Sequence, residues 1–252
     1  MVRLQGLRPA EMVWWLRARA TGHHDVNLRA SSVLDSKATM SDIAGTLWTS
    51  PGQYTGRVIK AAAAFGGIKL GFPANYVHHE DNHKEDFKSK FPHSKIPAWL
   101  GSDGFTLFES APVARYVSSL APHSGLLGSN PQERTLIDQW VHLIEEVNDN
   151  TENIEEILDG DLVPYTKPMH TTFVNQQLRG LTTLNNHLAT RTFFVGERIT
   201  LADIYVAALV LRACHINIDT AERKKLPHLM RHLETVVNQP VFEGIFPPLV
   251  VV

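Results

Sequence analysis

The chain is poor in cysteine. It has 252 residues and a single cysteine, Cys214. One cysteine excludes a disulfide within the chain and every Cys-x-x-Cys redox or zinc motif. A chain without a disulfide framework is typical of a reducing compartment, so we expect a cytoplasmic protein.

The chain also lacks a strong charge of either sign and a long apolar run. Its formal net charge is -2, which gives no electrostatic reason to expect nucleic acid or an anionic membrane as a partner. No apolar run approaches the roughly 20 residues that cross a bilayer. The hydrophobic content of 43% predicts a globular chain with a sizeable core.

A metal motif is missing as well, although histidine is frequent. His78, His79, His83 and His93 lie near one another in the sequence. Their spacing matches no standard zinc motif. We therefore predict a polar, solvated segment here and no metal site.

Residues 1–42 form a distinct N-terminal extension. They are rich in arginine and carry an apolar cluster from Met12 to Leu16. Such a leader suggests mitochondrial targeting, but its acidic residues argue against that. We expect an extension outside the folded part, or a chain that starts at Met40, with a mitochondrial leader as the alternative.

Residues 43–121 predict a small α/β domain. Apolar residues alternate or repeat in the order β-α-β-(α)-β-β-α, and a β-α-β unit favours parallel strands. The expected elements are a strand at 45–49, a helix at 53–65 capped by Gly66-Gly67, a strand at 68–70, a hairpin of 98–100 with 105–108, and a helix at 110–120.

The rest of the chain predicts an all-α domain. Residues 122–130 hold prolines and glycines and read as a linker. Apolar residues at helical spacing then continue through 131–252. We expect helices at 132–159, 173–188, 201–215 and 228–237, with the third buried on all sides, followed by an apolar tail. The fold class is therefore an α/β domain followed by a helical domain.

The tripeptide Lys95-Ile96-Pro97 stands just before the predicted hairpin. A cis bond to Pro97 would turn the chain and leave the N–H and C=O of Ile96 free for an extended peptide. The alternative is an ordinary proline that begins a strand.

Glu109 and Ser110 begin the helix that follows the hairpin. We expect Ser110 to be its N-cap. The free N–H groups and the dipole at a helix start favour a carboxylate, and Glu109 could accept from an ammonium. Together they suit the end of an α-amino acid. The alternative is a cap and a favourable first-turn charge.

Thr200 and Asp203 carry a structural signal. Thr200 precedes an apolar helix and Asp203 stands at its third position, which is the pattern of a capping box. We expect Asp203 to be buried at the helix start, where its loss affects folding before catalysis.

Lys-Ile-Pro, Glu-Ser and Val-Gly-Glu-Arg-Ile-Thr-Leu-Ala-Asp, in this order and spacing, resemble the glutathione transferase family. Within it, the likeness is closest to the transferase-like part of elongation factor 1B gamma, over about residues 44–245. The resemblance implies a thioredoxin-like domain that holds glutathione and a helical domain that supplies an electrophile pocket.

Carried over by position, the resemblance assigns the glutathione contacts. Ile96 pairs its backbone with the glutathione cysteine, and Pro97 is cis. Lys95 lies near the glycyl or γ-glutamyl carboxylate. Further residues implied for binding are His83, near the glycyl carboxylate, and Glu109 and Ser110, at the γ-glutamyl end.

The turn after the first strand departs from the family pattern. Members place a Tyr, Ser or Cys there, and a hydroxyl that donates to sulfur lowers the pKa of the thiol. Here residues 49–54 read Thr-Ser-Pro-Gly-Gln-Tyr. Ser50, Gln53 and Tyr54 are the candidate catalytic residues, and the choice among them stays open.

Two functions follow from the resemblance. The first is a glutathione transferase, expected to be a homodimer, that adds the glutathione thiolate to a hydrophobic electrophile. Later expulsion of glutathione would give double-bond isomerisation, which suits secondary metabolism. The second is a non-catalytic protein-interaction module resembling elongation factor 1B gamma. That factor continues into a lysine-rich linker and a further domain, which this sequence lacks, so we favour the enzyme.

Overall fold

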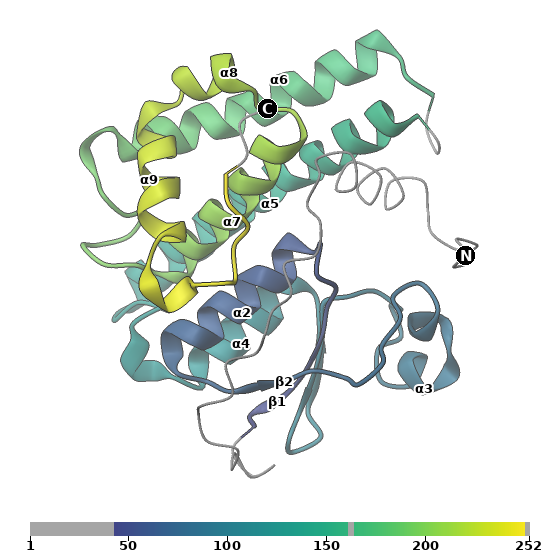
Figure 1. Ribbon diagram of the computed structural model, residues 1–252. Helices are drawn as coiled ribbons and strands as arrows, with labels where there is room; N and C mark the ends of the chain where they lie inside the picture. Colours follow the sequence, from purple (N-terminus) through teal and green to yellow (C-terminus); the bar gives the residue numbers. More distant parts are fainter. Residues whose placement is uncertain (1–42, 161–163, 250–252) are drawn as a thin grey trace, which may run out of the picture.

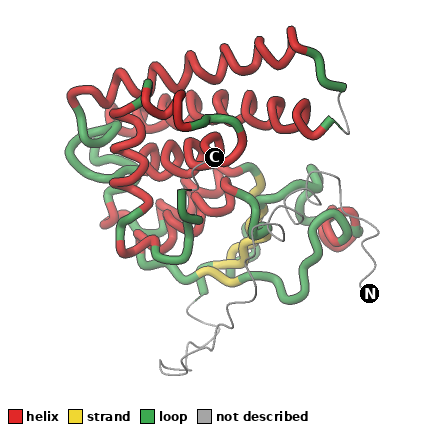
Figure 2. The backbone as a smooth tube through the Cα atoms, turned by 45° about the horizontal axis from the view of Figure 1, so that its top comes forward, coloured by secondary structure: helices red, strands yellow, loops and turns green. Residues whose placement is uncertain are grey.

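The computed structural model describes residues 43–160 and 164–249 (Figure 1). The predicted extension 1–42, with its mitochondrial-leader alternative, lies outside the described residues. A small sheet with its helices lies at one end of the molecule and a layer of long helices at the other (Figure 2). This arrangement confirms a thioredoxin-like α/β domain followed by a helical domain.

The sheet has four strands in the order β2-β1-β3-β4. β1 pairs parallel with β2 and antiparallel with β3, and β3 pairs antiparallel with β4. Helix α2 joins β1 to β2, which confirms the predicted β-α-β unit. The bounds are β1 Gly45–Trp48, α2 Tyr54–Gly66, β2 Leu70–Gly71, β3 Ala98–Gly101, β4 Thr106–Phe108 and α4 Ser110–Ser119.

The two faces of the sheet bury different clusters because successive side chains of a strand point to opposite sides. Leu47 and Trp99 belong to the main core, which α2 and α4 also line. Trp48 packs on the other face against Phe87 and Phe91. Those two phenylalanines follow η2 (Asp81–His83) and lie in or just after α3 (Glu85–Lys88). Both are buried core residues.

The helical domain is built on one largely buried helix. α7 has no exposed residue, as its apolar sequence predicts, and it packs against α5, α9 and the α2 of the other domain. Within the described residues, no helix has both the length and the apolar character that crossing a bilayer requires. The bounds are η3 Pro122–Ser124, α5 Pro131–Asp159, α6 Lys167–His187, η4 Leu188–Thr190, α7 Leu201–Ile216, α8 Thr220–Lys224, α9 Pro227–Val237 and η5 Pro240–Phe242.

The start of α6 differs from the predicted helix at 173–188. The helix begins at Lys167, six residues earlier, with Pro168 in its first turn. Proline suits that position because the first helical N–H groups have no intrahelical acceptor. The early turns are polar and exposed, so they show no apolar periodicity from which a helix could be predicted.

The capping box at the start of α7 is present. The fully buried carboxylate of Asp203 accepts from the backbone N–H of Thr200 at 2.8 Å and from its hydroxyl at 2.7 Å. It also accepts from the backbone N–H of Phe194 at 2.9 Å. His232 of α9 lies 2.9 Å from the same carboxylate. One side chain therefore joins α7, the loop before it and α9.

We expect Asp203→Ala to lower the free energy of unfolding by about 3 to 5 kcal/mol, because it leaves several buried donors without an acceptor. Urea unfolding measures the loss. The control is Asp219→Ala, since Asp219 caps the exposed helix α8 through the N–H of Glu222 at 2.8 Å. That change should cost about 1 kcal/mol. Equal losses for both variants would contradict the role given to Asp203.

Candidate functional site

The register of the hairpin brings the two predicted binding segments together. Ala98 of β3 pairs with Phe108 of β4. Continuing this antiparallel register by two residues predicts Ile96 opposite Ser110, and His93 of the same loop lies 3.8 Å from the Glu109 carboxylate. The Ile96–Pro97 peptide bond is cis, as the resemblance implies. The loop before β3 and the start of α4 therefore form one edge of the sheet.

Ile96 presents one free backbone group and not the two that the sequence predicts. Its carbonyl accepts from the side-chain amide of Gln53 at 2.6 Å. Its N–H makes no hydrogen bond to another described residue. Because a carbonyl oxygen has two lone pairs, it can still accept a second donor. Ile96 can thus pair with an extended peptide, with Gln53 holding its carbonyl in place.

Glu109, and not Ser110, is the N-cap of α4. Glu109 has φ 71° and ψ 138°, and Ser110 is the first helical residue. The N–H groups of Ser110 and Ala111 make no hydrogen bond to another described residue, and Pro112 has no N–H. A positive φ at a residue with a side chain costs about 1 to 3 kcal/mol and is typical of functional sites. The strained backbone leaves two donors open at the positive end of a helix.

The turn after β1 is held by its own side chains. Thr49 donates to the amide oxygen of Gln53 at 2.9 Å. A Cβ at residue 56 would lie 1.8 Å from the Thr49 hydroxyl oxygen, so Gly56 permits this close approach. Gln53 is therefore fixed at both ends of its amide. The hydroxyl of Ser50 makes no hydrogen bond to another described residue, and Ser50 is partly exposed.

The hydroxyl of Tyr54 is engaged away from this turn. It lies 2.5 Å from Nδ1 of His215 on α7, and Nε2 of the same ring lies 3.1 Å from the carbonyl of Pro248. Since a carbonyl only accepts, Nε2 carries the proton and Nδ1 accepts from Tyr54. Burial raises the pKa of Tyr54 to about 12 and lowers the pKa of His215. In this arrangement the Tyr54 hydroxyl donates its hydrogen bond to His215, so it is not available to donate to a thiolate.

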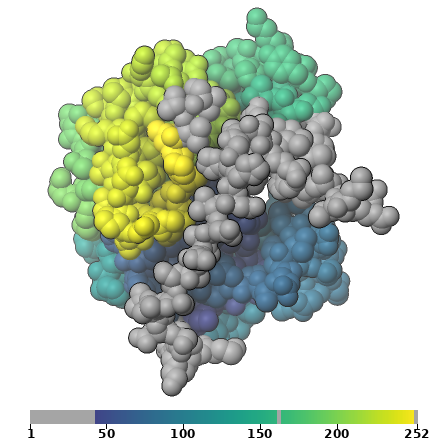
Figure 3. Space-filling model, viewed as in Figure 1, coloured from purple at the N-terminus to yellow at the C-terminus, as the bar shows by residue number. Residues whose placement is uncertain are grey.

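The C-terminal tail is anchored beside the turn. Arg57 of α2 donates to the carbonyl of Ile245 at 2.5 Å and to that of Pro51 at 2.6 Å. Phe246 and Leu249 pack against the main core. Figure 3 shows this last part of the chain (yellow) on the surface, beside the other residues of the helical domain. The tail thus borders the turn that holds Ser50.

The remaining predicted binding residues lie on the solvent side. Lys95 and His83 are exposed. Asn82, next to His83, donates to the carbonyl of Ser94 at 2.8 Å, which ties that segment to the loop before β3. No three His, Cys, Asp or Glu side chains within residues 43–160 and 164–249 gather as a metal site requires.

Two family models match the chain. The model of the glutathione S-transferase N-terminal domain matches residues 43–119, and that of the C-terminal domain matches residues 164–240. The chain belongs to the glutathione S-transferase family. The two matched ranges agree with the two parts of the fold, and together they cover more than half of the chain.

Curated relatives of this transferase-family chain include elongation factor 1-gamma of Danio rerio, 34% identical over 205 residues. Elongation factor 1-gamma of Rattus norvegicus is 32% identical over 219 residues. Each alignment covers 80% of this chain and 46% of the relative. The chain therefore spans about half the length of the curated relatives it matches.

Two solved structures share the transferase fold. A glutathione S-transferase from Methylobacillus flagellatus, with glutathione bound, has a TM-score of 0.71 at 20% identity and covers 81% of this chain and all of its own. The transferase-like domain of elongation factor 1-gamma from Saccharomyces cerevisiae has a TM-score of 0.69 at 23% identity. It covers 82% of this chain and 94% of its own.

Sequence reasoning missed three residues of the helical domain that interact with predicted site residues or lie near them. Ser110 donates to Glu145 of α5 at 3.3 Å. Tyr205 of α7 is fully buried, yet its hydroxyl has no hydrogen-bond partner among the described residues. Arg212 of α7 couples electrostatically to Tyr54. No local pattern marks them, because their partners are far away along the chain.

Arg212 is held by the side chains of α5. It donates to Asn148 at 2.8 Å, to Glu152 at 2.7 Å and to Glu155 at 2.9 Å. Only 17% of its side chain is exposed. The two carboxylates neutralise the guanidinium and keep it in place near Tyr54.

We expect the free energy of unfolding to fall as the pH falls through about 6.5, partly because of His215. The unfolded state takes up a proton there, whereas the folded imidazole, with its lowered pKa, stays neutral. His215→Gln keeps a donor for the Pro248 carbonyl. It should reduce the slope of the free energy of unfolding against pH by the amount that corresponds to at most one bound proton. Urea unfolding at several pH values measures it.

The matched control for this slope is His123→Gln, which replaces an exposed histidine of η3. A change of slope in the control as large as that in His215→Gln would contradict the assignment.

Proposed function

We propose that the chain binds glutathione along the edge formed by Ile96 and the start of α4. The supporting observation is that the N–H groups of Ile96, Ser110 and Ala111 make no hydrogen bond to another described residue. The Ile96 N–H suits the backbone of an extended cysteine. The two N–H groups of α4, at the positive end of its dipole, suit the γ-glutamyl carboxylate.

The rest of the tripeptide has complementary groups within the same edge. Glu109 is 60% exposed and can accept from the γ-glutamyl ammonium. Lys95 and His83, on the exposed side, suit the glycyl carboxylate. Pro97, which follows Ile96 through a cis peptide bond, is buried. The glutathione bound by the Methylobacillus transferase is in keeping with this proposal.

The proposed reaction is addition of the glutathione thiolate to an electrophilic carbon. The sulfur gives its electron pair to the new C–S bond, while the π bond of the electrophile, or in an aryl halide the carbon–halogen bond, breaks and takes the displaced pair; the thiol proton goes to solvent or to the adduct. We assign thiolate stabilisation to the hydroxyl of Ser50, because it is the hydroxyl of this turn without a described partner. Gln53 uses one amide N–H for Ile96 and has a second that could support the sulfur.

The electrophile is proposed to be a small hydrophobic molecule that meets the sulfur between the turn after β1, α5 and the tail at Phe246. If glutathione is retained, the product is a conjugate. If it is expelled again, the product is a double-bond isomer, as a secondary-metabolite pathway would use. A cytoplasmic homodimer remains part of the proposal.

The alternative is a protein-interaction module without turnover. The similarity to elongation factor 1-gamma favours it, and so does the engagement of the Thr49 and Tyr54 hydroxyls with Gln53 and His215. An assay of glutathione with an aryl halide separates the two. Glutathione binding without any conjugation of electrophiles would favour the module.

Ser110→Ala should weaken glutathione binding roughly ten- to a hundredfold, the effect of losing one hydrogen bond to a charged carboxylate. Isothermal calorimetry measures the affinity. The control is Ser119→Ala at the other end of α4, where the hydroxyl donates to the carbonyl of Tyr116. Absence of glutathione binding by the unaltered chain at millimolar concentration would overturn the proposal.

Ser50→Ala should raise the pKa of the bound thiol by about one to two units, since a hydrogen bond to a charged group contributes ~1.5–3 kcal/mol. The ultraviolet absorbance of the thiolate, followed against pH, measures this. Tyr54→Phe should leave the thiol pKa unchanged because its hydroxyl donates to His215. If the pKa of the bound thiol shifted in Tyr54→Phe and not in Ser50→Ala, thiolate stabilisation would belong to Tyr54 and the assignment to Ser50 would be wrong.

A further inference from the structure

One guanidinium connects the turn after β1 to the C-terminal tail. Arg57 of α2 donates through Nη2 to the carbonyl of Pro51, the residue after Ser50, at 2.6 Å. It donates through Nη1 to the carbonyl of Ile245 in the tail at 2.5 Å. The planar fork of one side chain therefore holds two segments from opposite ends of the described chain.

Arg57 has no carboxylate to neutralise its charge. Within residues 43–160 and 164–249 it forms no ion pair, and its Nε is buried without a hydrogen-bond partner. Burial lowers its pKa, and the centroid of the Tyr54 ring lies 5.5 Å from its Cζ. Arg212, by contrast, pairs with two carboxylates. Half-burying a charge without a counter-ion costs free energy, which favours a role for Arg57 in the site over a role in stability alone.

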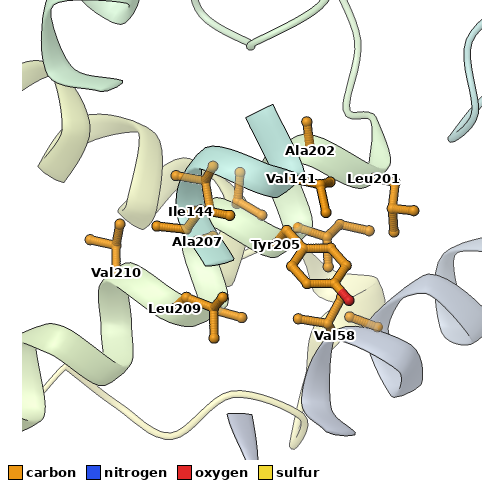
Figure 4. Close-up of a cluster of buried hydrophobic side chains, with 14 of the residues drawn as sticks. Val58, Val141, Ile144, Leu201, Ala202, Tyr205, Ala207, Leu209 and Val210 are labelled. Atoms are coloured by element: carbon orange, nitrogen blue, oxygen red, sulfur yellow. The ribbon is translucent and has the colours of Figure 1, made fainter. Parts of the chain in front are cut away.

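The helix that carries Arg57 is held by the core. Val58, the next residue of α2, belongs to the buried cluster that also contains Tyr205 of α7 (Figure 4). Both side chains are 0% exposed. Close-packed side chains of this kind resist displacement. Because the helix stays in place, the position of the guanidinium depends on the two carbonyls that it binds, and release of one changes the hold on the other.

A second side chain repeats the arrangement from the helical domain. His215 of α7 accepts from the Tyr54 hydroxyl at 2.5 Å, and its Nε2 lies 3.1 Å from the carbonyl of Pro248. Tyr54 begins α2 directly after the turn. Turn and tail are thus linked at two places, and Phe246 lies between the two tail carbonyls, those of Ile245 and Pro248.

We propose that Arg57 is a positioning residue that couples the tail to thiolate formation at Ser50. The inference rests on the proposed function, in which Ser50 stabilises the thiolate and Phe246 borders the electrophile. With the tail in place, Arg57 holds the Pro51 carbonyl and with it the turn beside Ser50. When the tail leaves, the guanidinium loses one of its two acceptors and holds the turn less firmly. An electrophile bound against the tail and glutathione bound at the turn therefore favour each other.

Hydrogen exchange of the tail, followed by mass spectrometry on the full chain, tests the coupling. Saturating glutathione should slow exchange in the peptide 243–249 by about fivefold, the lower end of couplings between sites. Arg57→Met, which removes every donor of the fork, should abolish this slowing. The control is Arg231→Met, because Arg231 of α9 also donates to two carbonyls, those of Leu188 and Arg191, at 2.8 Å each.

A second measurement approaches the coupling from the tail. His215→Phe removes the anchor of the Pro248 carbonyl and should raise the pKa of the bound thiol by about half a unit, a threefold change in its ionisation equilibrium. In the Arg57→Met background the same change should leave the thiol pKa where it is, because the link is already broken. Arg57→Lys keeps the charge but replaces the fork by a single ammonium, so the coupling should be lost there too.

The outcomes separate this inference from the proposed function. If the unaltered chain does not bind glutathione in calorimetry, both are overturned. If it binds glutathione but the tail exchanges equally fast with and without it, or if Arg57→Met and Arg231→Met respond alike, glutathione binding stands and the role of Arg57 is overturned. Equal shifts of the thiol pKa by His215→Phe in both backgrounds, or full coupling in Arg57→Lys, would also overturn the positioning role.

Discussion

The hydrogen bonds of the buried Asp203 carboxylate determine where α7 begins, and the rest of the site depends on that helix. Asp203 joins the first turn of α7 to the preceding loop and, through His232, to α9. α7 then packs against α2 and carries Tyr205, Arg212 and His215 toward the other domain. A displaced α7 would move all three side chains at once. A residue remote from the binding edge therefore governs its geometry.

The edge formed by Ile96 and the start of α4 depends on the pairing register of β3 and β4. Because Ala98 pairs with Phe108, the cis-Pro97 loop and the start of α4 lie side by side. A shift of one residue would turn the side chains of β4 to opposite faces and separate the two segments. Burial of Trp99 in the main core, with its β4 partner Leu107 packed against the same core, holds this register.

Much of the fold could be predicted from sequence because its signals are local. Apolar periodicity predicts α2, α4, α5 and α7, the glycine after α2 caps it, and Thr200 with Asp203 forms the expected box. The site was less predictable. The positive φ of Glu109, which moves the cap from Ser110, has no local signal. The pairing of Tyr54 with His215 spans 161 positions, so only the packed structure shows that its hydroxyl is engaged.

The C-terminal tail is held through its backbone. Arg57 and His215 bind the carbonyls of Ile245 and Pro248, and carbonyls are present whatever the side chains are. Phe246, between the two anchors, can therefore be exchanged without loss of the attachment. The path of the tail can therefore stay constant while its side chains vary, and under the proposed function such substitutions would change the surface offered to an electrophile.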